Sequence, residues 1–252
     1  MSIIAIDYGK SKCGYATGSI FVAKSGTIKT SELFKQIQPF TIVILGLPLS
    51  MSGNYSSQTF EVVRLALKLK EMKKEVLLID ERLTTKMAKT YEKKEDDRFS
   101  AEQLLLEYIQ SPQRAIPLKK CVIEDIEKRI LNGNSVLNAL IDSDFAILID
   151  VPYHNYFKIK NGIGLSNNPY SAYTIFTNGF FVYRVMKDFV ERITSMISEL
   201  NRMPDYIIIN KTSRRMLSDL LDFKDYEHIK ALSMLLNDGK VKIQEFSVHC
   251  SA

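Results

Sequence analysis

A short N-terminal stretch decides the fold class: Ile3-Ile4-Ala5-Ile6-Asp7-Tyr8-Gly9-Lys10-Ser11-Lys12-Cys13-Gly14-Tyr15-Ala16. Four small or apolar residues run directly into Asp7, and a polar turn bracketed by Gly9 and Gly14 leads to a second apolar run. A strand that is apolar at every position is buried on both faces, as in the middle of a mixed or parallel sheet. A carboxylate at the end of such a strand costs free energy unless it is paired, hydrogen-bonded or bound to a metal. Asp7 is therefore the first residue whose chemistry needs an explanation.

The composition predicts a folded protein of one large domain or two domains of ordinary size. The chain has 252 residues, of which 46% are hydrophobic and 10% aromatic, so a core can form and wholesale disorder is excluded. No uninterrupted apolar run reaches about 18 residues, which argues against a membrane-spanning helix. The N-terminus enters a strand at once, without the layout of a signal peptide, so we expect a cytoplasmic protein.

Cysteine and histidine usage argues against a metal site built from these residues. The cysteines Cys13, Cys121 and Cys250 are far apart and odd in number, so we expect free thiols in a reducing cytoplasm. Their spacing is not that of zinc ligands, and the chain has only three histidines. A zinc or histidine-based site is therefore not expected.

Positive charge is concentrated in the first half of the chain. The net charge is +5, but residues 1–120 carry 19 Lys and Arg against 13 Asp and Glu, and the remainder carries 15 against 16. The basic half is the candidate for contact with phosphate backbones. A modest excess of lysine is also typical of an ordinary solvated surface, so charge alone does not identify a nucleic-acid-binding protein.

The order of elements in the first half predicts an α/β layered domain. Strands alternate with amphipathic helices, and a segment with Pro112 and Pro117 is typical of a domain boundary. The expected strands are 3–8, 12–18, 20–28, 41–46 and 76–79, and the expected helices are 31–38, 56–73 and 97–109. We therefore place a first domain at residues 1–112 and a second at residues 121–252.

The second half predicts an α/β or α+β domain with its own core. The expected strands are 145–151, 173–183, 206–210 and 241–248, and the expected helices are 124–131, 186–201, 214–221 and 229–236. An extended stretch at 156–160 and a loop rich in Gly, Asn and Ser up to Pro169 separate the first two strands. Two roles are open for this half: substrate binding, and assembly into a homodimer.

Three acidic positions lie where buried segments meet loops. Asp7 ends the first strand, Asp80 and Glu81 follow the strand at 76–79, and Asp97 opens the next expected helix. In open α/β sheets, functional groups gather at the carboxyl ends of the strands. The spacing of Asp97 places it on the apolar face of its helix, so its side chain is expected to face the sheet.

Carboxylates that converge without histidine or cysteine suit Mg²⁺ or Mn²⁺, which prefer oxygen ligands and keep waters for the substrate. Two such ions about 3.5–4 Å apart clamp the attacking and leaving oxygens of an in-line phosphoryl displacement. Each acid also has an ordinary interpretation: Asp97 as a favourable charge at a helix N-terminus, and Glu81 as a partner of Arg82 or a lysine. Asp80 and Glu81 point to opposite faces of their strand, and spacing does not say which joins Asp7.

Four motifs occur in order over residues 1–110. They are Ala5-Ile6-Asp7-Tyr8-Gly9 with Gly14 and Ala16; Gly46-Leu47-Pro48-Leu49-Ser50-Met51-Ser52-Gly53 with Gln58; Asp80-Glu81-Arg82-Leu83-Thr84-Thr85; and Asp97 with Ser100-Ala101 and Tyr108. With these motifs the first half resembles the RuvX/YqgF family of Holliday-junction resolvases and pre-16S rRNA nucleases. The resemblance implies a ribonuclease H-like mixed sheet with flanking helices. It also implies that Asp7, Glu81 and Asp97 are catalytic residues that bind the metal, and so favours Glu81 over Asp80.

The sequence departs from the family pattern in two places. The first turn reads Ser11-Lys12-Cys13, where the family usually has a basic pair before an aliphatic residue. The segment between the third strand and the loop at Gly46 is also short. Both differences bear on substrate contact rather than on the acids.

Polar and basic residues around the acids are candidates for binding nucleic acid. Small residues in the loop from Gly46 to Gln58 allow close approach of a backbone, and amides at a helix start favour phosphate. The same loop is typical of an ordinary strand-to-helix connection, and the basic residues are equally typical of a surface. The candidates are Lys10, Lys12, Ser52, Asn54, Gln58, Arg82, Thr84 and Lys86.

The element order of the second half loosely repeats that of the first, with Asp150 at the end of its first strand. One alternative for this half is therefore a degenerate second ribonuclease H-like copy. It lacks a motif like the one at Gly46, so we expect no second active site. The run Tyr153-His154-Asn155-Tyr156-Phe157-Lys158 has aromatic rings that can stack on bases, but packing in a core or a subunit interface is the favoured interpretation.

The leading hypothesis is a Mg²⁺-dependent endonuclease on structured nucleic acid, in which a metal-activated water attacks a phosphodiester. The alternative is a catalytically idle nucleic-acid-binding or assembly protein with a ribonuclease H-like fold. Actin-like ATP hydrolysis is not favoured, because the chain has no second Gly-rich nucleotide loop. The choice between a DNA junction and precursor rRNA stays open, since recognition of shape leaves little trace in a sequence.

Overall fold

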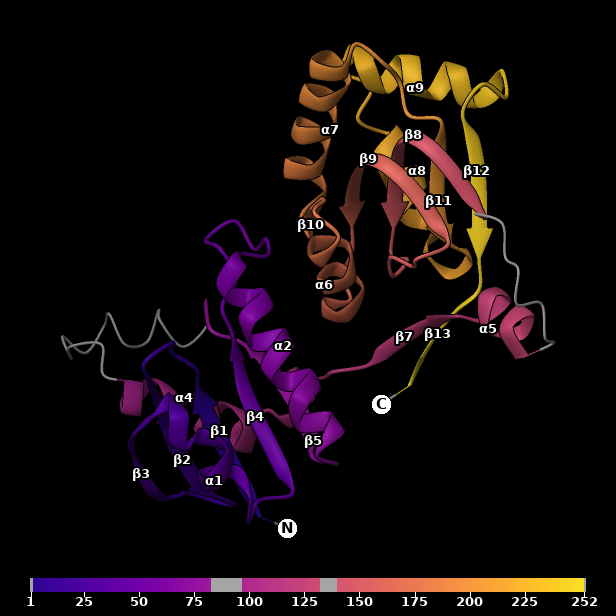
Figure 1. The fold of residues 1–252 in the computed structure, drawn as a ribbon. Coiled ribbons are helices and arrows are strands. Elements are labelled where there is room, and N and C mark those ends of the chain that lie inside the picture. Colours follow the sequence, from indigo (N-terminus) through magenta and orange to yellow (C-terminus); the bar gives the residue numbers. More distant parts are fainter. Residues whose placement is uncertain (1, 83–96, 132–139, 252) are drawn as a thin grey trace. The chain divides into compact units, whose positions relative to one another are not determined.

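The computed structural model describes residues 2–131 and 140–251, except for residues 83–96. The chain forms two compact units, Met1–Leu118 and Lys119–Ala252 (Figure 1).

The first unit is built on a mixed sheet with the strand order β3-β2-β1-β4-β5-β6. The strands are β1 (Ile3–Asp7), β2 (Lys12–Gly18), β3 (Val22–Lys29), β4 (Ile42–Leu47), β5 (Glu75–Asp80) and β6 (Ile116–Pro117). β1, β4 and β5 run parallel, whereas β2 is antiparallel to both of its neighbours. This is the ribonuclease H-like order that the resemblance implies.

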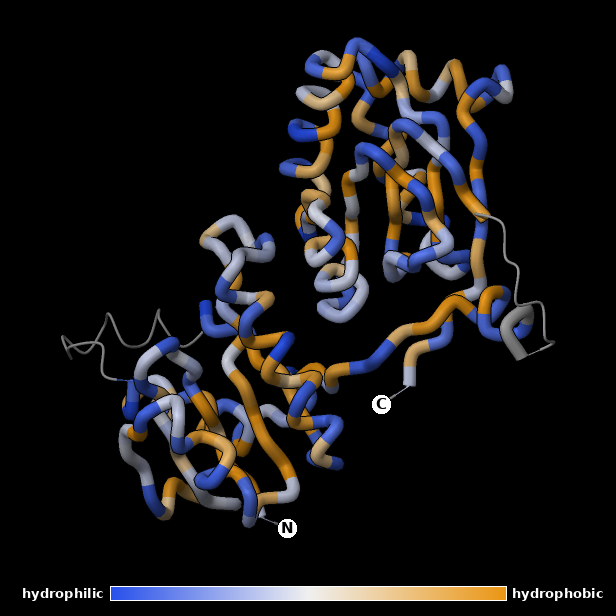
Figure 2. The backbone as a smooth tube through the Cα atoms, viewed as in Figure 1, coloured by the Kyte–Doolittle hydropathy of each residue, from blue (hydrophilic) through white to orange (hydrophobic). Residues whose placement is uncertain are grey.

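Helices cover the first sheet. They are α1 (Leu33–Ile37), which follows a 3-10 turn (Thr30–Glu32), α2 (Ser57–Glu71), α4 (Asp97–Gln110) and the short turn η2 (Pro112–Arg114). α4 packs on β1, β2, β3 and β4, and α2 packs on β4 and β5. The core under α4 contains Ala5, Ile44, Ala101 and Leu104, all of them buried. β4 is coloured mostly as hydrophobic in Figure 2, as expected of a strand covered on both faces.

The second unit is built on a five-stranded sheet in which all neighbouring strands are parallel. The order is β10-β9-β8-β11-β12, with β8 (Ile141–Ile149), β9 (Phe157–Leu165), β10 (Phe181–Tyr183), β11 (Tyr206–Asn210) and β12 (Lys242–Phe246). The helices are α5 (Glu124–Leu131), α6 (Pro169–Thr177), α7 (Met186–Leu200), α8 (Arg214–Leu221), which follows the turn η3 (Lys211–Ser213), and α9 (Glu227–Asn237). α7 shows its apolar side toward the sheet and its polar side away from it (Figure 2).

The second sheet is not a copy of the ribonuclease H-like topology. Both sheets place their first five strands in the order third, second, first, fourth, fifth. In the first unit, however, the second strand is antiparallel to the first, whereas β9 is parallel to β8. The alternative of a degenerate second copy is therefore wrong with respect to strand direction.

The strand expected at 173–183 is wrong over its first half, because residues 173–177 belong to α6; only Phe181–Tyr183 at its end form a strand, β10. The Asn168 side chain accepts hydrogen bonds from the amides of Tyr170 (2.9 Å) and Ser171 (3.0 Å), which caps the helix, and Pro169 occupies its first turn. These start signals outweigh the β-propensity of the aromatic and β-branched residues that follow. The expected loop before Pro169 is also shorter than predicted, since β9 continues to Leu165.

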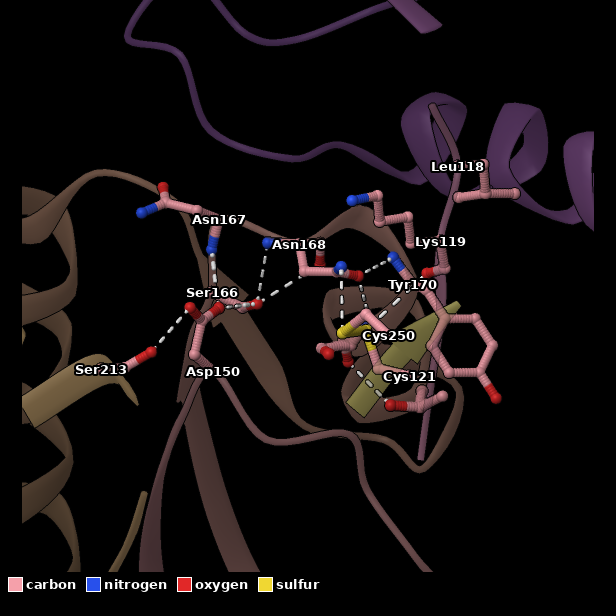
Figure 3. The surroundings of a disulfide bond; sticks show 12 residues. Leu118, Lys119, Cys121, Asp150, Ser166, Asn167, Asn168, Tyr170, Ser213 and Cys250 are labelled. Carbon is pink, nitrogen blue, oxygen red and sulfur yellow. Dashed lines mark hydrogen bonds between the residues drawn. A yellow bond between two sulfur atoms is a disulfide. The ribbon is translucent and has the colours of Figure 1, made fainter. Parts of the chain in front are cut away.

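Cys121 and Cys250 form a disulfide, so the expectation of free thiols is wrong for these two residues (Figure 3). They lie opposite each other on β7 (Lys120–Ile123) and β13 (Val248–Ser251), which form an antiparallel pair. The final strand expected at 241–248 is thus two strands with different partners, β12 and β13. Cys13 is free and buried, as expected.

Removing the disulfide by the double substitution Cys121→Ser and Cys250→Ser should lower the free energy of unfolding of the second unit by about 2–4 kcal/mol. The cross-link joins residues separated by 129 positions, so it restricts the unfolded chain strongly. Urea unfolding of both proteins, with and without a reductant, measures the effect. A reductant should destabilise the wild type and leave the double variant unchanged; equal stability of the two oxidised proteins would contradict the assignment.

Candidate active site

Gly14 lets the N-terminus of α4 approach the end of β1. It pairs with Asp7 across β1 and β2. A Cβ added to Gly14 would overlap the carbonyl oxygen of Asp97 and would lie 2.9 Å from the amide nitrogen of Arg98. The first turn of α4 therefore rests directly on β2, beside Asp7. Ser100, one turn into the helix, makes a side-chain hydrogen bond with Asp7.

Gly46 has the corresponding role on the other side of Asp7. Since Ile6 pairs with Leu45, the next position of β4 places Gly46 beside Asp7. A Cβ added to Gly46 would lie 2.8 Å from both Cγ and Cδ of Glu81, and would overlap its Oε1. The Glu81 side chain thus occupies the space above Gly46. Both strands next to Asp7 carry glycine, and through these two glycines the structure brings Glu81 and Asp97 to Asp7.

Burial and neighbouring charges raise the pKa of Asp7 to about 6. Burial is the largest cause, because a carboxylate loses water when its strand is covered. The hydrogen bond from Ser100 and the charge of Lys12 lower the pKa, whereas the charge of Asp97 raises it. The repulsion between Asp7 and Asp97 shows that the two carboxylates are close enough to interact.

Burial, together with the charges of Asp7 and Asp80, raises the pKa of Glu81 to about 8. Glu81 therefore keeps its proton at neutral pH while no cation is bound. Asp7 interacts electrostatically with both other acids, and it is the centre of the cluster.

Asp97 has one carboxylate oxygen that is buried. Lys12 Nζ lies 2.9 Å from this oxygen, Oδ2, in an ion pair. Within residues 2–82, 97–131 and 140–251, no donor is directed at Oδ2 at hydrogen-bonding angles, so the contact with Lys12 is electrostatic. A buried oxygen of this kind has lone pairs left for a cation.

The three acids fit a hard divalent cation. Their ligand atoms are all carboxylate oxygens, and burial and the charges of neighbouring acids raise the pKa values of Asp7 and Glu81. Among the described residues, no hydrogen-bond donor is directed at Asp97 Oδ2. A cation would relieve this repulsion. In the part of the chain that the structure describes, no group of three acidic, histidine or cysteine side chains is already gathered at metal-ligand geometry. The acids are therefore neighbours that a cation would draw together.

The Asp80 carboxylate pairs with the side chain of Arg82. Its Oδ1 accepts hydrogen bonds from the backbone amide and from Nε of Arg82, both at 3.0 Å, and its Oδ2 lies 2.6 Å from Nη2 of the same side chain. Both carboxylate oxygens are used in this pair. The geometry therefore favours Glu81 over Asp80 as the companion of Asp7, in agreement with the resemblance.

The loop between β4 and α2 is held by its own side chains. Ser52 Oγ lies 3.0 Å from Ser50 Oγ and accepts a hydrogen bond from Nδ2 of Asn54 at 3.3 Å. Asn54 is buried, whereas Gln58 is exposed in the first turn of α2. Ser52 and Asn54 thus shape the loop, and Gln58 is accessible from solvent.

The candidate basic residues differ in how closely they approach the acids. Lys12 lies within the cluster, as described above, whereas Lys10 is exposed and pairs with Glu61 of α2 at 3.1 Å. Arg82 is bound to Asp80. Thr84 and Lys86 lie outside the residues that the structure describes.

The aromatic run of the second unit is used in packing. The ring of Tyr153 lies 6.0 Å from that of Phe157 and 5.4 Å from that of Phe180, and its hydroxyl donates to the carbonyl of Phe157. Phe157 is buried and also packs against Phe246. These contacts support the core interpretation of the run rather than stacking on bases.

Three features of the site were missed by sequence reasoning: the hydrogen bond of Ser100, the steric role of Gly46, and the pair of Asp80 with Arg82. Ser100 follows Asp97 by three positions, a spacing that places both on one helix face and was a usable signal. The position of Gly46 opposite an acidic side chain depends on the register between strands, which the sequence does not show.

The chain is similar in sequence to known proteins. A sequence model of the family described as "RuvX: Holliday junction resolvase" matches residues 1–111. A protein of Thermotoga maritima named "Putative pre-16S rRNA nuclease" is 35% identical over 188 residues, covering 72% of this chain and 79% of that protein. Proteins with the same name from Alcanivorax borkumensis and Rickettsia typhi are 35% identical over 112 residues and 34% identical over 102 residues, covering 38% and 35% of this chain and 84% and 65% of their own.

The fold and the acidic cluster define a ribonuclease H-like protein of the nuclease class. The chain belongs to the RuvX family. The match to the Thermotoga protein covers 72% of 252 residues, about 181, and so continues beyond residue 111 into the second unit. The similarity is therefore longer than the motifs of the first half indicate.

No helix within the described residues is long and apolar enough to cross a bilayer.

In the absence of divalent cations, the free energy of unfolding should fall as the pH rises from about 4.5 to about 8. Folded Glu81 keeps its proton up to about pH 8, whereas the unfolded chain loses it near the ordinary value of 4.5, so the folded state binds more protons in this window. The slope due to this residue is at most about 1.4 kcal/mol for each pH unit. Asp7 acts in the same direction between 3.8 and about 6.

Urea unfolding at a series of pH values measures this dependence, and Glu81→Gln serves as the comparison because it carries no titratable carboxyl group. The variant should show a flatter profile between pH 6 and pH 8, where Asp7 no longer contributes. Identical profiles of the variant and the wild type would contradict the raised pKa of Glu81.

Proposed function

We propose that the protein is a divalent-metal-dependent endonuclease that hydrolyses phosphodiesters in structured nucleic acid. The observation that carries the proposal is the convergence of Glu81 and Asp97 on Asp7 through two glycines that leave room for them. Membership of the RuvX family supports it, and so do the names of the relatives, which refer to Holliday junctions and to pre-16S rRNA.

Asp7, Glu81 and Asp97 are the residues that would hold Mg²⁺ or Mn²⁺. The cation supplies Lewis-acid stabilisation of the phosphoryl oxygens and a nucleophilic water at neutral pH. Asp7 interacts with both other acids, so it is the residue whose carboxylate would contribute most directly to holding the cation. Glu81 must lose its proton when the cation binds, so cation affinity is expected to rise with pH up to about 8.

The candidate binding residues belong to the first half of the chain, which also carries the excess of positive charge. Lys12, beside Asp7 and Asp97, is placed to meet the phosphate at the reacting position. Lys10, Gln58 and Arg82 are placed to contact phosphates beyond it, and Ser52 and Asn54 to shape the loop that the strand passes. We assign Thr84 and Lys86 to the same role on the basis of the sequence alone.

The substrate is a DNA junction or precursor rRNA, and the second unit contributes substrate binding or homodimer formation. We also propose a cytoplasmic location, where both nucleic acids occur. The Cys121–Cys250 disulfide argues in the other direction, because such bonds are uncommon in reducing compartments.

Asp7→Asn should reduce cleavage to the background level and leave nucleic-acid binding intact. The substitution keeps the size of the side chain and removes the charge at the centre of the acidic cluster, so the site would lose one of the three carboxylates that would hold the cation. A four-way DNA junction and a precursor rRNA fragment, each in Mg²⁺ and in Mn²⁺, are the substrates to compare. Whichever is cut by the wild type alone identifies the substrate.

Asp238→Asn is a matched control, since Asp238 is an exposed carboxylate of the second unit that pairs with Lys240 at 3.6 Å. It should cut as the wild type does. Cleavage by Asp7→Asn at the wild-type rate would refute the assigned site. Binding without cleavage by the wild type in either cation would favour the idle nucleic-acid-binding protein instead.

A further inference from the structure

The guanidinium group of Arg82 is fixed on one side by Asp80. Nε lies 3.0 Å and 3.1 Å from the two carboxylate oxygens, and Nη2 lies 2.6 Å from Oδ2. The backbone amide of Arg82 also donates to Oδ1 at 3.0 Å, so Asp80 holds both the start and the end of the side chain. Bidentate pairs of this kind fix the plane of the guanidinium as well as its position.

The other side of the guanidinium faces the turn before α2. A Cβ added to Gly53 would lie 2.7 Å from Nη1 of Arg82, so the turn and the guanidinium are in close proximity. The turn has a defined shape: Gly53 N donates to Ser50 O at 2.8 Å, and Ser50 N donates to Asn54 O at 2.9 Å. Gly53 has φ 94°, a conformation that favours glycine.

We propose that Asp80 is a positioning residue for the nuclease reaction proposed above, which holds the Arg82 guanidinium against the turn at Gly53 so that Nη1 meets a phosphate of the nucleic acid. Asp80 takes the hydrogen bonds of Nε and Nη2 and leaves the Nη1 edge directed toward the loop. An arginine without this partner samples many rotamers and loses them on binding, at a cost in affinity. Asp80 removes that cost before the substrate arrives.

The direction in which removal of the Asp80 charge changes the affinity for nucleic acid distinguishes this role from simple electrostatic repulsion. Asp80 carries a negative charge beside a surface that would bind a polyanion. If Asp80 were an ordinary surface carboxylate, its removal would strengthen binding of nucleic acid, because repulsion would decrease. If Asp80 positions Arg82, the same removal weakens binding.

Binding is measured in EDTA, so that no cleavage occurs, with a four-way DNA junction and a precursor rRNA fragment over a series of salt concentrations. Arg82→Gln should weaken binding about tenfold or more, as for a charge-assisted hydrogen bond, and should lower the salt slope by about 0.7–0.9. Asp80→Asn should weaken binding about threefold to tenfold and lower the slope in the same direction. The double variant should bind no more weakly than Arg82→Gln alone, because the two residues act as one unit.

Gly53→Ala perturbs the same guanidinium without a change at Asp80, because the new methyl group meets Nη1. Gly179→Ala is its matched control: Gly179 also has a positive φ, 86°, but a Cβ there would meet nothing within 4 Å. Gly53→Ala should weaken binding as Asp80→Asn does, and Gly179→Ala should not. Asp80→Glu, which keeps the carboxylate, should restore part of the affinity.

Glu107→Gln controls for the loss of a negative charge, since Glu107 pairs with Arg114 at 3.5 Å ten residues beyond the start of α4. It should bind as the wild type or slightly more tightly. Asp80→Asn that binds as tightly as the wild type, or whose effect adds fully to that of Arg82→Gln, overturns the proposal. Failure of the nuclease assignment is seen separately, as wild-type binding without cleavage when Mg²⁺ replaces EDTA.

Discussion

The space beside Asp7 is the constraint on which the rest of the site depends. Asp7 lies in the middle of the first sheet, so any neighbour with a side chain would fill the positions next to it. Gly14 and Gly46 leave those positions open, one to the backbone at Asp97 and the other to the side chain of Glu81. Alanine at either glycine would push one of the acids away from Asp7 before any chemistry could begin.

This close approach has an electrostatic cost. Desolvation and mutual repulsion raise the pKa values of Asp7 and Glu81, so the cluster is stabilised by protons, by Lys12 or by a cation. Protons and divalent cations compete for the same oxygens. The repulsion that makes the cluster unfavourable by itself would therefore be relieved by a cation and would contribute to its binding free energy. The acidic cluster therefore lowers the stability of the fold locally, as is common at functional positions.

The sequence predicts those parts of the fold that depend on local signals. The strands ending at Asp7 and Asp80, the helix that opens at Asp97 and the buried face of α4 were all expected from periodicity and end signals. The disulfide was not, because Cys121 and Cys250 meet only through the pairing of strands 129 positions apart. For the site, the sequence was enough to propose which acids take part. The register that sets Gly46 beside Asp7 could not be predicted, because it depends on how the strands pair in the folded sheet. The strand expected where α6 lies was wrong for another reason: the helix cap at Asn168 outweighed the β-propensity of the residues that follow.

The two sheets share the order of their first five strands, but the acid at the end of the first strand has different neighbours in each sheet, and strand direction explains the difference. In the first unit the antiparallel β2 returns from the turn after Asp7 and sets Gly14 opposite it. In the second unit β9 runs parallel to β8, so the residues beside Asp150 come from the end of β9 and the turn that follows.

There Asp150 accepts hydrogen bonds from Ser166 Oγ (2.6 Å), Asn167 N (3.1 Å) and Ser213 Oγ (3.0 Å), as Figure 3 shows. A carboxylate bound by three donors is stabilised where it is and fixes the loops around it. Asp7, by contrast, has a side-chain hydrogen bond with Ser100 and is repelled by the charge of Asp97. The same position in the strand order thus gives a structural acid in one unit and a candidate catalytic acid in the other.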